Sequence, residues 1–429
     1  MYLYINGADT LCAAVENCSR ARVRIVDKRP VRLGGKIDYN MGLALIVGVM
    51  LVGAVWGEEI SLLGPLGLDT IDNTLIDTEL VVVFTIFRHG DRTPDEEELV
   101  LYPSDQQLSE GIYFPFGKKA LTNKGKQRSF FVGSYLRELY DGFISRLYLP
   151  DEISVRTTDY DRTKMTALTA MAAMFPPQPA QKWNLQLDWQ PIPYDTEPAD
   201  EDDLLYWYNC PRYLMLRDQI YEKPEVKKWL DPYEGLFKLL SDKSGKNITT
   251  PVDVFYIDNL FQTLNNVGVD PPMWAIEVMP KIKAMTRIEY AIEFYNSELI
   301  KLATGVLMDF ILNTTNAAIQ NSSKPVEPKM HIISAHENNV AALMAAARVF
   351  EAHQPNYGAT FSLELRKNML TGEYGITAVY SRDAGGPGEV LPINGCANKL
   401  FCNYNKFVSL VKEVAWSKEE MSEACKKSP

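Results

Sequence analysis

The segment from Arg88 to Pro94 places one histidine between two arginines. A neutral imidazole can attack phosphorus and hold the phosphoryl group covalently. The guanidinium groups of Arg88 and Arg92 carry fixed planar donors that suit phosphoryl oxygens and stabilise their charge in the transition state. Gly90 removes a side chain that would keep a ligand from the backbone. We predict that His89 is a nucleophile for phosphoryl transfer and that both arginines bind the phosphate. The alternative is a tight turn whose arginines only form salt bridges.

A second histidine lies beside a carboxylate where the apolar run from Met330 to Ala335 ends. His336 could donate to a phosphate oxygen, and Glu337 could protonate the leaving alkoxide, which departs poorly without that proton. The alternative is a histidine at a strand end that is capped by the following acid. If Glu337 is not the acid, Asp91 and the acidic segment from Glu197 to Asp203 are the next candidates.

A third candidate lies in the segment 153–163, where a short alternating strand gives way to polar capping residues and then a helix. Arg162 would lie in or near the first helical turn, where free backbone amides and a guanidinium group make an anion site. Asp159 or Asp161 could pair with it instead. We predict that Arg162 completes the phosphate site and that Arg156 supports the site without touching substrate.

The elements that must position these residues are apolar strands. Residues 81–87 form a near-continuous apolar run, typical of a strand buried on both faces of a mostly parallel sheet. In open α/β sheets the chemistry lies just beyond the carboxyl ends of strands, where His89 and His336 both fall. Residues 360–365 and 376–381 alternate at period two and predict an antiparallel pair at the edge of the sheet.

Helical periodicity accounts for much of the remaining chain. It predicts one helix from Leu121 to about Tyr140 and a long amphipathic helix over 288–312. Between 181 and 285, aromatic and charged residues alternate, which favours short helices forming a cap inserted into an α/β core of residues 58–180 and 286–429. The positions expected in the core are Phe130, Phe131, Tyr135, Leu136 and Leu139 in the first helix and Tyr290, Ile292, Phe294, Leu299, Leu302 and Leu307 in the second.

The N-terminal extension, residues 1–57, does not read as a folded domain. Residues 41–56 carry no charge and follow a basic stretch. That run is short for a spanning helix and close to the apolar core of a secretory signal, with Val55 and Gly57 as small residues before a cleavage point. A signal anchor behind a basic cytoplasmic tail is the competing interpretation, and Met41 is a second candidate start. Either way the rest of the chain would cross a membrane, staying attached only if 41–56 is uncleaved.

Composition agrees with an extracytoplasmic protein. The formal net charge of -11 argues against nucleic-acid binding, which needs a basic face. An even number of cysteines follows Gly57, which suggests two disulfides and allows three pairings. The short loop between Cys396 and Cys402 favours a local pair, leaving Cys210 and Cys425. Glycan acceptor triplets begin at Asn247, Asn313 and Asn321.

Two motifs carry a resemblance to a known family. Arg-His-Gly-x-Arg-x-Pro at 88–94 and Arg-x-Thr-Asp-x-Asp-Arg-Thr at 156–163 resemble those of the histidine acid phosphatases, in the phosphoglycerate-mutase-like superfamily. The resemblance covers about residues 79–428 and implies the same two disulfide pairs. Its usual second motif is His-Asp, whereas this chain has His336-Glu337, which adds a methylene to the acid. The secreted form with this glutamate looks most like the insect venom acid phosphatases.

Together, these observations predict an acid phosphatase that hydrolyses phosphate monoesters through a phosphohistidine, secreted or in a lysosomal lumen. No cofactor or metal is implied, because three arginines supply the positive charge and no histidine, cysteine and aspartate cluster has ligand spacing. A secreted anion-binding protein with weakened catalysis is the alternative, and a phosphomutase is a third reading that the secretion signal weighs against. The natural substrate is left open, and so is whether the protein is a homodimer.

Overall fold

The computed structural model describes residues 75, 77–102, 110–321, 326–397 and 400–426. The predicted signal segment, 41–56, and the rest of the N-terminal extension lie outside the described residues.

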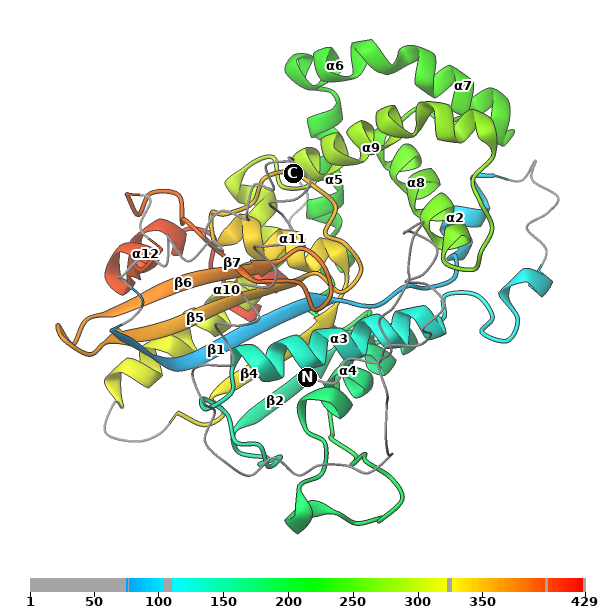
Figure 1. Ribbon diagram of the computed structural model, residues 1–429. Helices are drawn as coiled ribbons and strands as arrows, with labels where there is room; N and C mark the ends of the chain where they lie inside the picture. The colour runs from blue at the N-terminus through cyan, green and yellow to red at the C-terminus, as the bar shows by residue number, and fades with distance from the viewer. Residues whose placement is uncertain (1–74, 76, 103–109, 322–325, 398–399, 427–429) are drawn as a thin grey trace, which may run out of the picture. The chain divides into compact units, whose positions relative to one another are not determined.

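A mixed sheet forms the centre of the fold (Figure 1). Its strand order is β3-β2-β4-β1-β5-β6-β7, and β8 pairs with β6. The pairs from β3 to β1 are parallel and those from β1 to β7 are antiparallel, so the sheet is only partly parallel. The strands are β1 (Thr78–Arg88), β2 (Ile153–Thr157), β3 (Asp195–Thr196), β4 (Met330–Ala335), β5 (Thr360–Asn368), β6 (Tyr374–Ser381), β7 (Glu389–Leu391) and β8 (Cys402–Asn403). The predicted antiparallel pair is β5 and β6, but β5 lies inside the sheet beside β1.

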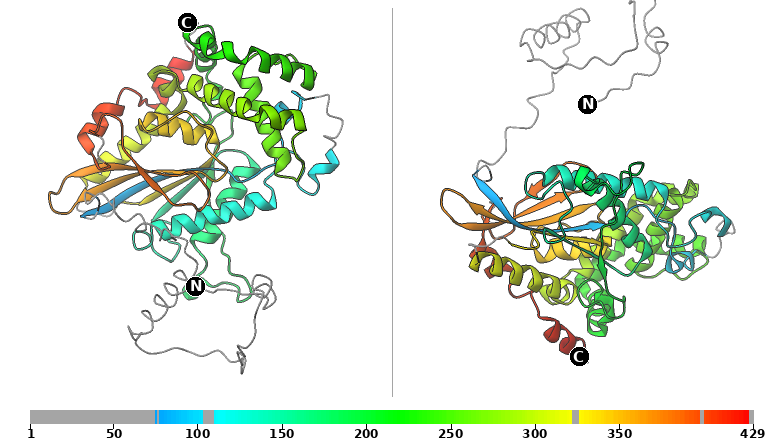
Figure 2. Two further views of the ribbon diagram at one scale, coloured as in Figure 1. Left: turned by 45° about the horizontal axis from the view of Figure 1, so that its top comes forward. Right: turned by 90° about the horizontal axis from the view of Figure 1, so that it is seen from below.

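Strand β1 is buried on both faces, as its apolar run predicts. Helices lie on either side of the sheet (Figure 2): α3 (Asn123–Leu139), α4 (Asp161–Met174), α10 (Ser297–Gln320), α11 (Glu337–Ala346) and α12 (Tyr404–Val411). Alternate side chains of β1 enter two separate cores. Phe84 and Ile86 pack with residues of α10, α11 and α12, and Val83 and Phe87 pack with residues of α3 and α4.

The predicted buried face of α3 is partly wrong. Phe130, Phe131 and Leu139 are 46 %, 47 % and 38 % exposed, whereas Leu136 is buried. The helix turns a face of small residues inward, because its backbone lies directly against a neighbouring helix: a Cβ on Gly133 would lie 2.0 Å from the carbonyl oxygen of Ala170 in α4. Close packing of two helix backbones therefore overrides the pattern of large apolar residues.

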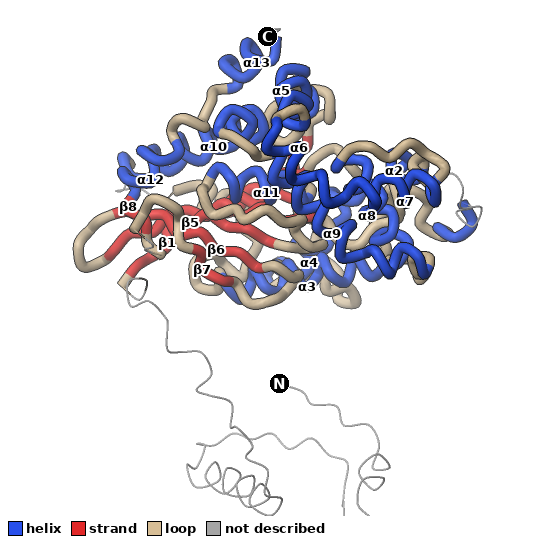
Figure 3. The backbone as a smooth tube through the Cα atoms, turned by 90° about the horizontal axis from the view of Figure 1, so that it is seen from above, coloured by secondary structure: helices blue, strands red, loops and turns tan. Residues whose placement is uncertain are grey.

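A helical insertion lies in the chain between α4 and α10, and its helices gather beyond one end of the sheet (Figure 3). Its helices run from Pro211 to Glu293, where the sequence predicted a cap over 181–285. Its last three helices share a core that includes Leu240, Leu260 and Ile282, whereas Tyr213 and Val226 of the first two pack with residues of α10 and α11. The insertion contains α5 (Pro211–Tyr221), α6 (Pro224–Leu230), α7 (Glu234–Ser244), α8 (Pro251–Asn265) and α9 (Met273–Glu293); the chain also has α2 (Glu96–Leu99), α13 (Lys418–Lys426) and short 3-10 turns at Glu110–Tyr113, Pro179–Gln181, Trp207–Asn209 and Asp231–Tyr233.

The single helix predicted over 288–312 is two helices. The chain leaves α9 after Glu293, and the side chain of Asn296 caps α10 by accepting from the backbone N–H of Leu299 at 2.9 Å. All six apolar positions predicted to be buried there are buried. Among the described residues, α10 is the one helix whose length and composition would suffice to cross a membrane. Since Leu307 and Met308 pack in the core, core packing accounts for its composition.

Two disulfides stabilise the outer parts of this fold. Cys210, at the start of α5, is joined to Cys425 in α13, and Cys396 is joined to Cys402. These are the two expected pairs. The asparagines of the three glycan acceptor triplets, Asn247, Asn313 and Asn321, are all exposed.

Candidate active site

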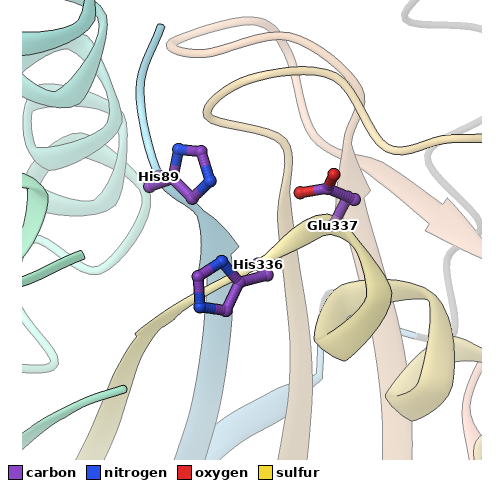
Figure 4. A group of neighbouring side chains, drawn as sticks. All are labelled: His89, His336 and Glu337. Atoms are coloured by element: carbon purple, nitrogen blue, oxygen red, sulfur yellow. The ribbon is translucent and has the colours of Figure 1, made fainter. Parts of the chain in front are cut away.

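Three strand ends meet at one place. β1 and β4 run parallel with Arg88 opposite Ala335, so the residues that follow each strand come side by side. The rings of His89 and His336 are 5.3 Å apart between centroids and nearly perpendicular, at 77°. Figure 4 shows His89 at the end of β1 approaching His336 and Glu337 at the start of α11. The chain after β2 brings Arg162 to the same place.

The hydrogen bonds of His89 define which ring nitrogen is free. Its Nδ1 lies 2.8 Å from the carbonyl oxygen of Gly90, and because a carbonyl can only accept, Nδ1 carries the hydrogen. The lone pair is therefore on Nε2, which accepts a hydrogen bond from Nε of Arg162 at 3.2 Å. This tautomer presents a nucleophilic nitrogen to a group bound beside Arg162.

The surroundings of His89 keep it uncharged. Burial lowers the pKa of His89 well below its usual value of 6.5, and the charge of Arg162, His336, Arg88 and Arg92 lowers it further. The downward direction of this pKa shift suits an enzyme that works in acid. An imidazole with a lowered pKa stays unprotonated at pH values where an ordinary histidine would already carry a proton.

Arg88, the residue before His89, is buried and pairs with the candidate acid. Its Nε lies 2.9 Å from Oε2 of Glu337, and its Nη1 donates to the carbonyl oxygen of Pro355 at 2.8 Å. The ring of Tyr357 lies 3.9 Å from the guanidinium carbon and fixes its plane. Nη2 of Arg88 has no hydrogen-bond partner among the described residues, so it is free to donate to a bound oxyanion.

Arg92 is held by an acid that the sequence did not single out. Its two terminal nitrogens donate to both oxygens of buried Glu98, at 2.9 Å and 2.5 Å. Asp95 lies 3.7 Å from Nη1 of the same guanidinium. Nε of Arg92 has no partner in the described part of the chain. The sequence signal for Glu98 is the Asp95-x-x-Glu98 spacing, which forms a capping box at the start of α2.

Arg162 lies in the first turn of α4, as predicted, but pairs with neither nearby acid. Asp159 binds Lys164 instead, at 2.5 Å. Nη2 of Arg162 lies 3.4 Å from Asp95, its guanidinium stacks over the ring of Tyr160 at 4.6 Å, and its Nη1 has no partner among the described residues. Nε of Arg162 therefore donates to His89, and its Nη1 is left without a hydrogen-bond partner among the described residues. We call Arg88, Arg92 and Arg162 together the phosphate cradle.

His336 caps helix α11, so its ring orientation is set by the backbone. The His336 side chain accepts from the backbone N–H of Asn339. The backbone N–H of His336 donates to Oδ1 of Asn339 at 3.1 Å. Its Nε2 lies 3.0 Å from Oγ1 of Thr158, which gives its single hydrogen to Thr163. Nε2 of His336 therefore carries the hydrogen and donates to Thr158. Thr158 is a site neighbour that the sequence did not identify.

Other predicted residues lie near the site for different reasons. A Cβ on Gly90 would lie 2.2 Å from the carbonyl oxygen of Gly125, so this glycine admits helix α3 and not a ligand. Asp91 is buried against Arg128, at 2.5 Å, and does not face His89 as an alternative acid would. Arg156 binds Asp202 at 2.8 Å and so anchors the acidic segment that the sequence offered as another source of the acid.

The site opens into a pocket of about 440 Å³. The side with His89, Arg92 and Arg162 is basic, whereas the opposite wall is aromatic and polar and comes from the helical insertion, the turn before it and the start of α11. That wall includes Tyr206, Trp207, Tyr208, Phe255, Tyr256, Glu293 and Asn338. A larger hollow, about 780 Å³, lies at the other end of β1 and contains no histidine or cysteine.

The site also contains atoms of the kinds that bind metals. Nitrogen or oxygen atoms of His89, His336 and Glu337 lie within 4.8 Å of one another. However, Arg88 is paired with Glu337 and Arg162 donates to His89. Positive guanidinium groups on two of the three ligands oppose a cation and suit an anion. A metal-free site stays our prediction.

The residues matched by a family model include every one of these groups. Residues 79–369 match the model of the histidine phosphatase superfamily (branch 2). The chain belongs to this family of histidine acid phosphatases. It is 31 % identical to the venom acid phosphatase of Apis mellifera over 348 residues, which is 81 % of this chain and 88 % of that protein. It is 33 % identical to the prostatic acid phosphatase of Homo sapiens over 368 residues, covering 82 % of this chain and 90 % of that protein.

Solved structures support the fold. The phytase of Hafnia alvei in complex with myo-inositol hexakis sulphate superimposes with a TM-score of 0.59, at 14 % identity over 82 % of this chain and 99 % of that chain. The Klebsiella phytase matches with a TM-score of 0.58 and 14 % identity, over 82 % and 100 % of the two chains. At this identity the likeness describes the fold alone. It agrees with the predicted α/β class.

Proposed function

We propose that this histidine acid phosphatase hydrolyses phosphate monoesters through a phosphohistidine on His89. The observation that carries the proposal is the orientation of His89: Nδ1 donates to a carbonyl group, and the free Nε2 points toward the guanidinium group of Arg162. Arg88, Arg92 and Arg162 are close enough to His89 to lower its pKa, and each has a nitrogen without a partner among the described residues. An anion bound by those donors has its phosphorus within reach of the nucleophile.

In the first step Nε2 of His89 forms a bond to phosphorus while the bond from phosphorus to the ester oxygen breaks. The three arginines stabilise the charge on the equatorial oxygens. The departing alkoxide takes a proton from the carboxyl group of Glu337, which is left as a carboxylate beside Arg88. The products of this step are an alcohol and a phosphohistidine.

In the second step water attacks the phosphohistidine. The carboxylate of Glu337 takes a proton from that water, the bond from phosphorus to Nε2 breaks, and inorganic phosphate and neutral His89 result. His336 assists as a phosphate ligand by moving its Nε2 hydrogen from Thr158 to a phosphate oxygen. Glu337 thus returns to its protonated state in each turnover.

The role of Glu337 is tested by comparing esters with good and poor leaving groups. In Glu337→Gln the amide cannot give up a proton, so turnover of an alkyl phosphate should fall about a hundredfold or more, as expected for loss of a general acid. Turnover of an aryl phosphate should fall far less, because its leaving group needs the proton less. Steady-state kinetics at acidic pH on both esters, with exposed Glu351→Gln as the matched control, measures the difference.

Equal losses on both esters would move the acid role to another residue. Asp95 is then the first candidate, since it lines the pocket and lies 3.4 Å from Arg162. The wild-type protein should also resist chelators and be inhibited by vanadate, which mimics the trigonal-bipyramidal phosphoryl group. A folded protein that binds phosphate but hydrolyses neither ester would instead be the anion-binding protein.

We also propose that the protein works outside the cytoplasm, as a secreted or lysosomal glycoprotein. Two disulfides support this, because such bonds persist mainly in oxidising compartments. Relatives named for venom and for the lysosome agree with it. Glycan release followed by mass measurement should find sugar on exposed Asn247 in particular, since it lies in a loop, whereas Asn313 lies within α10.

A further inference from the structure

One buried acid on the wall opposite the phosphate cradle has no role in the proposed reaction. Glu293 is the last residue of α9, is 4 % exposed and lines the same pocket as His89 and Glu337. A carboxyl group is seldom buried without partners for both of its oxygens. Oε2 of Glu293 nevertheless has no hydrogen-bond partner among the described residues.

A chain of hydrogen bonds fixes the position of Glu293. The hydroxyl of Tyr290 donates to Oδ1 of Asn338 at 2.8 Å, and Nδ2 of Asn338 donates to the hydroxyl oxygen of Tyr208 at 2.6 Å. Tyr208 then donates to Oε1 of Glu293 at 2.8 Å. Nδ2 of Asn338 also donates to Oε1 of Glu293, at 3.5 Å. Oε1 is therefore occupied, and Oε2 is the oxygen without a partner among the described residues. Glu293 and Asn338 line the same pocket as the candidate acid Glu337.

The surroundings of Glu293 favour its uncharged form. Burial raises the pKa of Glu293, and the charge of Glu289, one helical turn earlier, raises it further. Glu289 is itself held by the hydroxyl of Tyr221 at 2.7 and 2.8 Å. In acid, Glu293 is therefore a neutral carboxyl group, which can both donate and accept at its open end.

We propose that Glu293, Asn338 and Tyr208 form a leaving-group subsite that binds a hydroxyl group of a polyhydroxylated alcohol. This rests on the proposed phosphatase function and names its substrate class: monophosphates of sugars or polyols. A hydroxyl group is the partner that fits, because it too donates and accepts. The neighbouring rings of Tyr206 and Trp207 offer flat apolar faces for the carbon skeleton of such an alcohol.

The same wall is poorly suited to a second phosphate group. Beyond the cradle, the lysine and the arginine that line the pocket each have an acidic partner: Lys119 lies 2.6 Å from Glu96, and Arg217 lies 3.1 Å from Asp218. Nε1 of Trp207 and Nε of Arg217 also have no hydrogen-bond partner among the described residues. The acids that line the same pocket, Asp95, Glu97, Glu98 and Glu293, repel a second phosphate wherever they are ionised. The subsite therefore favours alcohols that carry hydroxyl groups and a single phosphate.

Two esters with the same ring size and the same phosphorylated CH₂ group test the subsite. Glucose 6-phosphate and cyclohexylmethyl phosphate both place a phosphorylated CH₂ on a six-membered ring, and only the first has hydroxyl groups. The ratio of their kcat/KM values should favour glucose 6-phosphate in the wild-type protein. In Glu293→Leu the ratio should fall about tenfold, the usual effect of losing a buried hydrogen bond to substrate. In Glu293→Gln, which still donates and accepts, most of the preference should remain, and exposed Glu277→Leu on the same helix is the control.

A ratio that is unchanged in Glu293→Leu would overturn the proposal. So would an equal fall in Glu293→Gln, which would mean that a negative charge is required; a preference for choline phosphate over the isosteric 3,3-dimethylbutyl phosphate would then identify a cationic leaving group. If Glu293→Leu fails to fold, Tyr208→Phe replaces it. The ratio should then fall in Tyr208→Phe, and an unchanged ratio would contradict the proposal. Wild-type activity on phenyl phosphate distinguishes failure of the phosphatase proposal from failure of the subsite proposal. If the protein does not hydrolyse phenyl phosphate, the proposed function itself is refuted.

Discussion

The two ends of the active-site pocket are built in different ways. The phosphate end consists of residues just beyond β1, β2 and β4, where neighbouring strands in parallel register bring His89, His336 and Arg162 together. The leaving-group end consists of side chains from the helical insertion and the turn before it, including Tyr208 and Glu293. Charge and fixed donors dominate the first end, and aromatic rings and neutral hydrogen-bonding groups dominate the second. Under the proposed mechanism, the chemical step and the choice of alcohol fall at different ends of the pocket.

After loss of His89 itself, the largest expected effect comes from removing a guanidinium group at the phosphate end. Arg88→Ala should lower kcat by about a hundredfold to a thousandfold on every ester, because its donors stabilise charge that develops in the transition state. It also leaves Glu337 without its buried partner. Exposed Arg146→Ala, which loses only a surface pair with Asp141, is the control. A loss that depended on the alcohol would break the separation between the two ends.

A smaller effect is expected on the pH dependence of the phosphate end. The pKa of His89 is lowered first by burial and next by the charge of Arg162. The nucleophile should therefore remain active as the pH falls through 6.5, and its protonation should limit kcat/KM only at lower pH. Arg162→Gln removes one positive charge, so the acidic limb should move to higher pH, while Arg128→Gln, whose arginine binds Asp91, should not move it. Identical limbs in wild type and Arg162→Gln would show that this charge does not tune His89.

The sequence allowed the phosphate end to be predicted in detail because its signals are local. Apolar runs end at His89 and His336, and a capping pattern precedes Arg162, so strand ends and a helix start could be located without the fold. Glu98 was not singled out from the sequence, although its spacing from Asp95 was a usable signal. Nothing local marked Tyr357, which reaches Arg88 only through the folded chain.

The leaving-group end could not be predicted in this way. Glu293 read as one polar position in a long amphipathic helix, and its partners Tyr208 and Asn338 come from distant segments. The inward face of α3 was misjudged for a related reason: Gly133 is buried by contact with Ala170, and a glycine gives no hydrophobic signal. When contacts between distant segments decide which residues are buried, the local pattern of apolar residues does not predict the burial.

The smallest effect on activity is expected from the disulfides, and it should differ between the two ends. The Cys210–Cys425 bond spans 215 residues and the Cys396–Cys402 bond spans 6. Loop-closure entropy predicts that they add about 5 and about 2 kcal/mol to the free energy of unfolding. Two variants, each with both cysteines of one bond replaced by serine, are compared by urea unfolding. The loss of unfolding free energy should be larger for the Cys210–Cys425 bond than for the Cys396–Cys402 bond. Cys210 lies two residues after Tyr208 in the sequence. Only loss of the Cys210–Cys425 bond should therefore alter the ratio of the kcat/KM values for glucose 6-phosphate and cyclohexylmethyl phosphate.

The phosphohistidine is the central claim, and trapping it is the most direct test. A ³²P-labelled aryl monoester should be mixed with the enzyme, quenched within milliseconds and worked up in alkali, because phosphohistidine is labile in acid. Peptide mapping should find the label on His89, and His89→Ala should carry no label and show no turnover. Label on a serine, or turnover that survives His89→Ala, would contradict the mechanism.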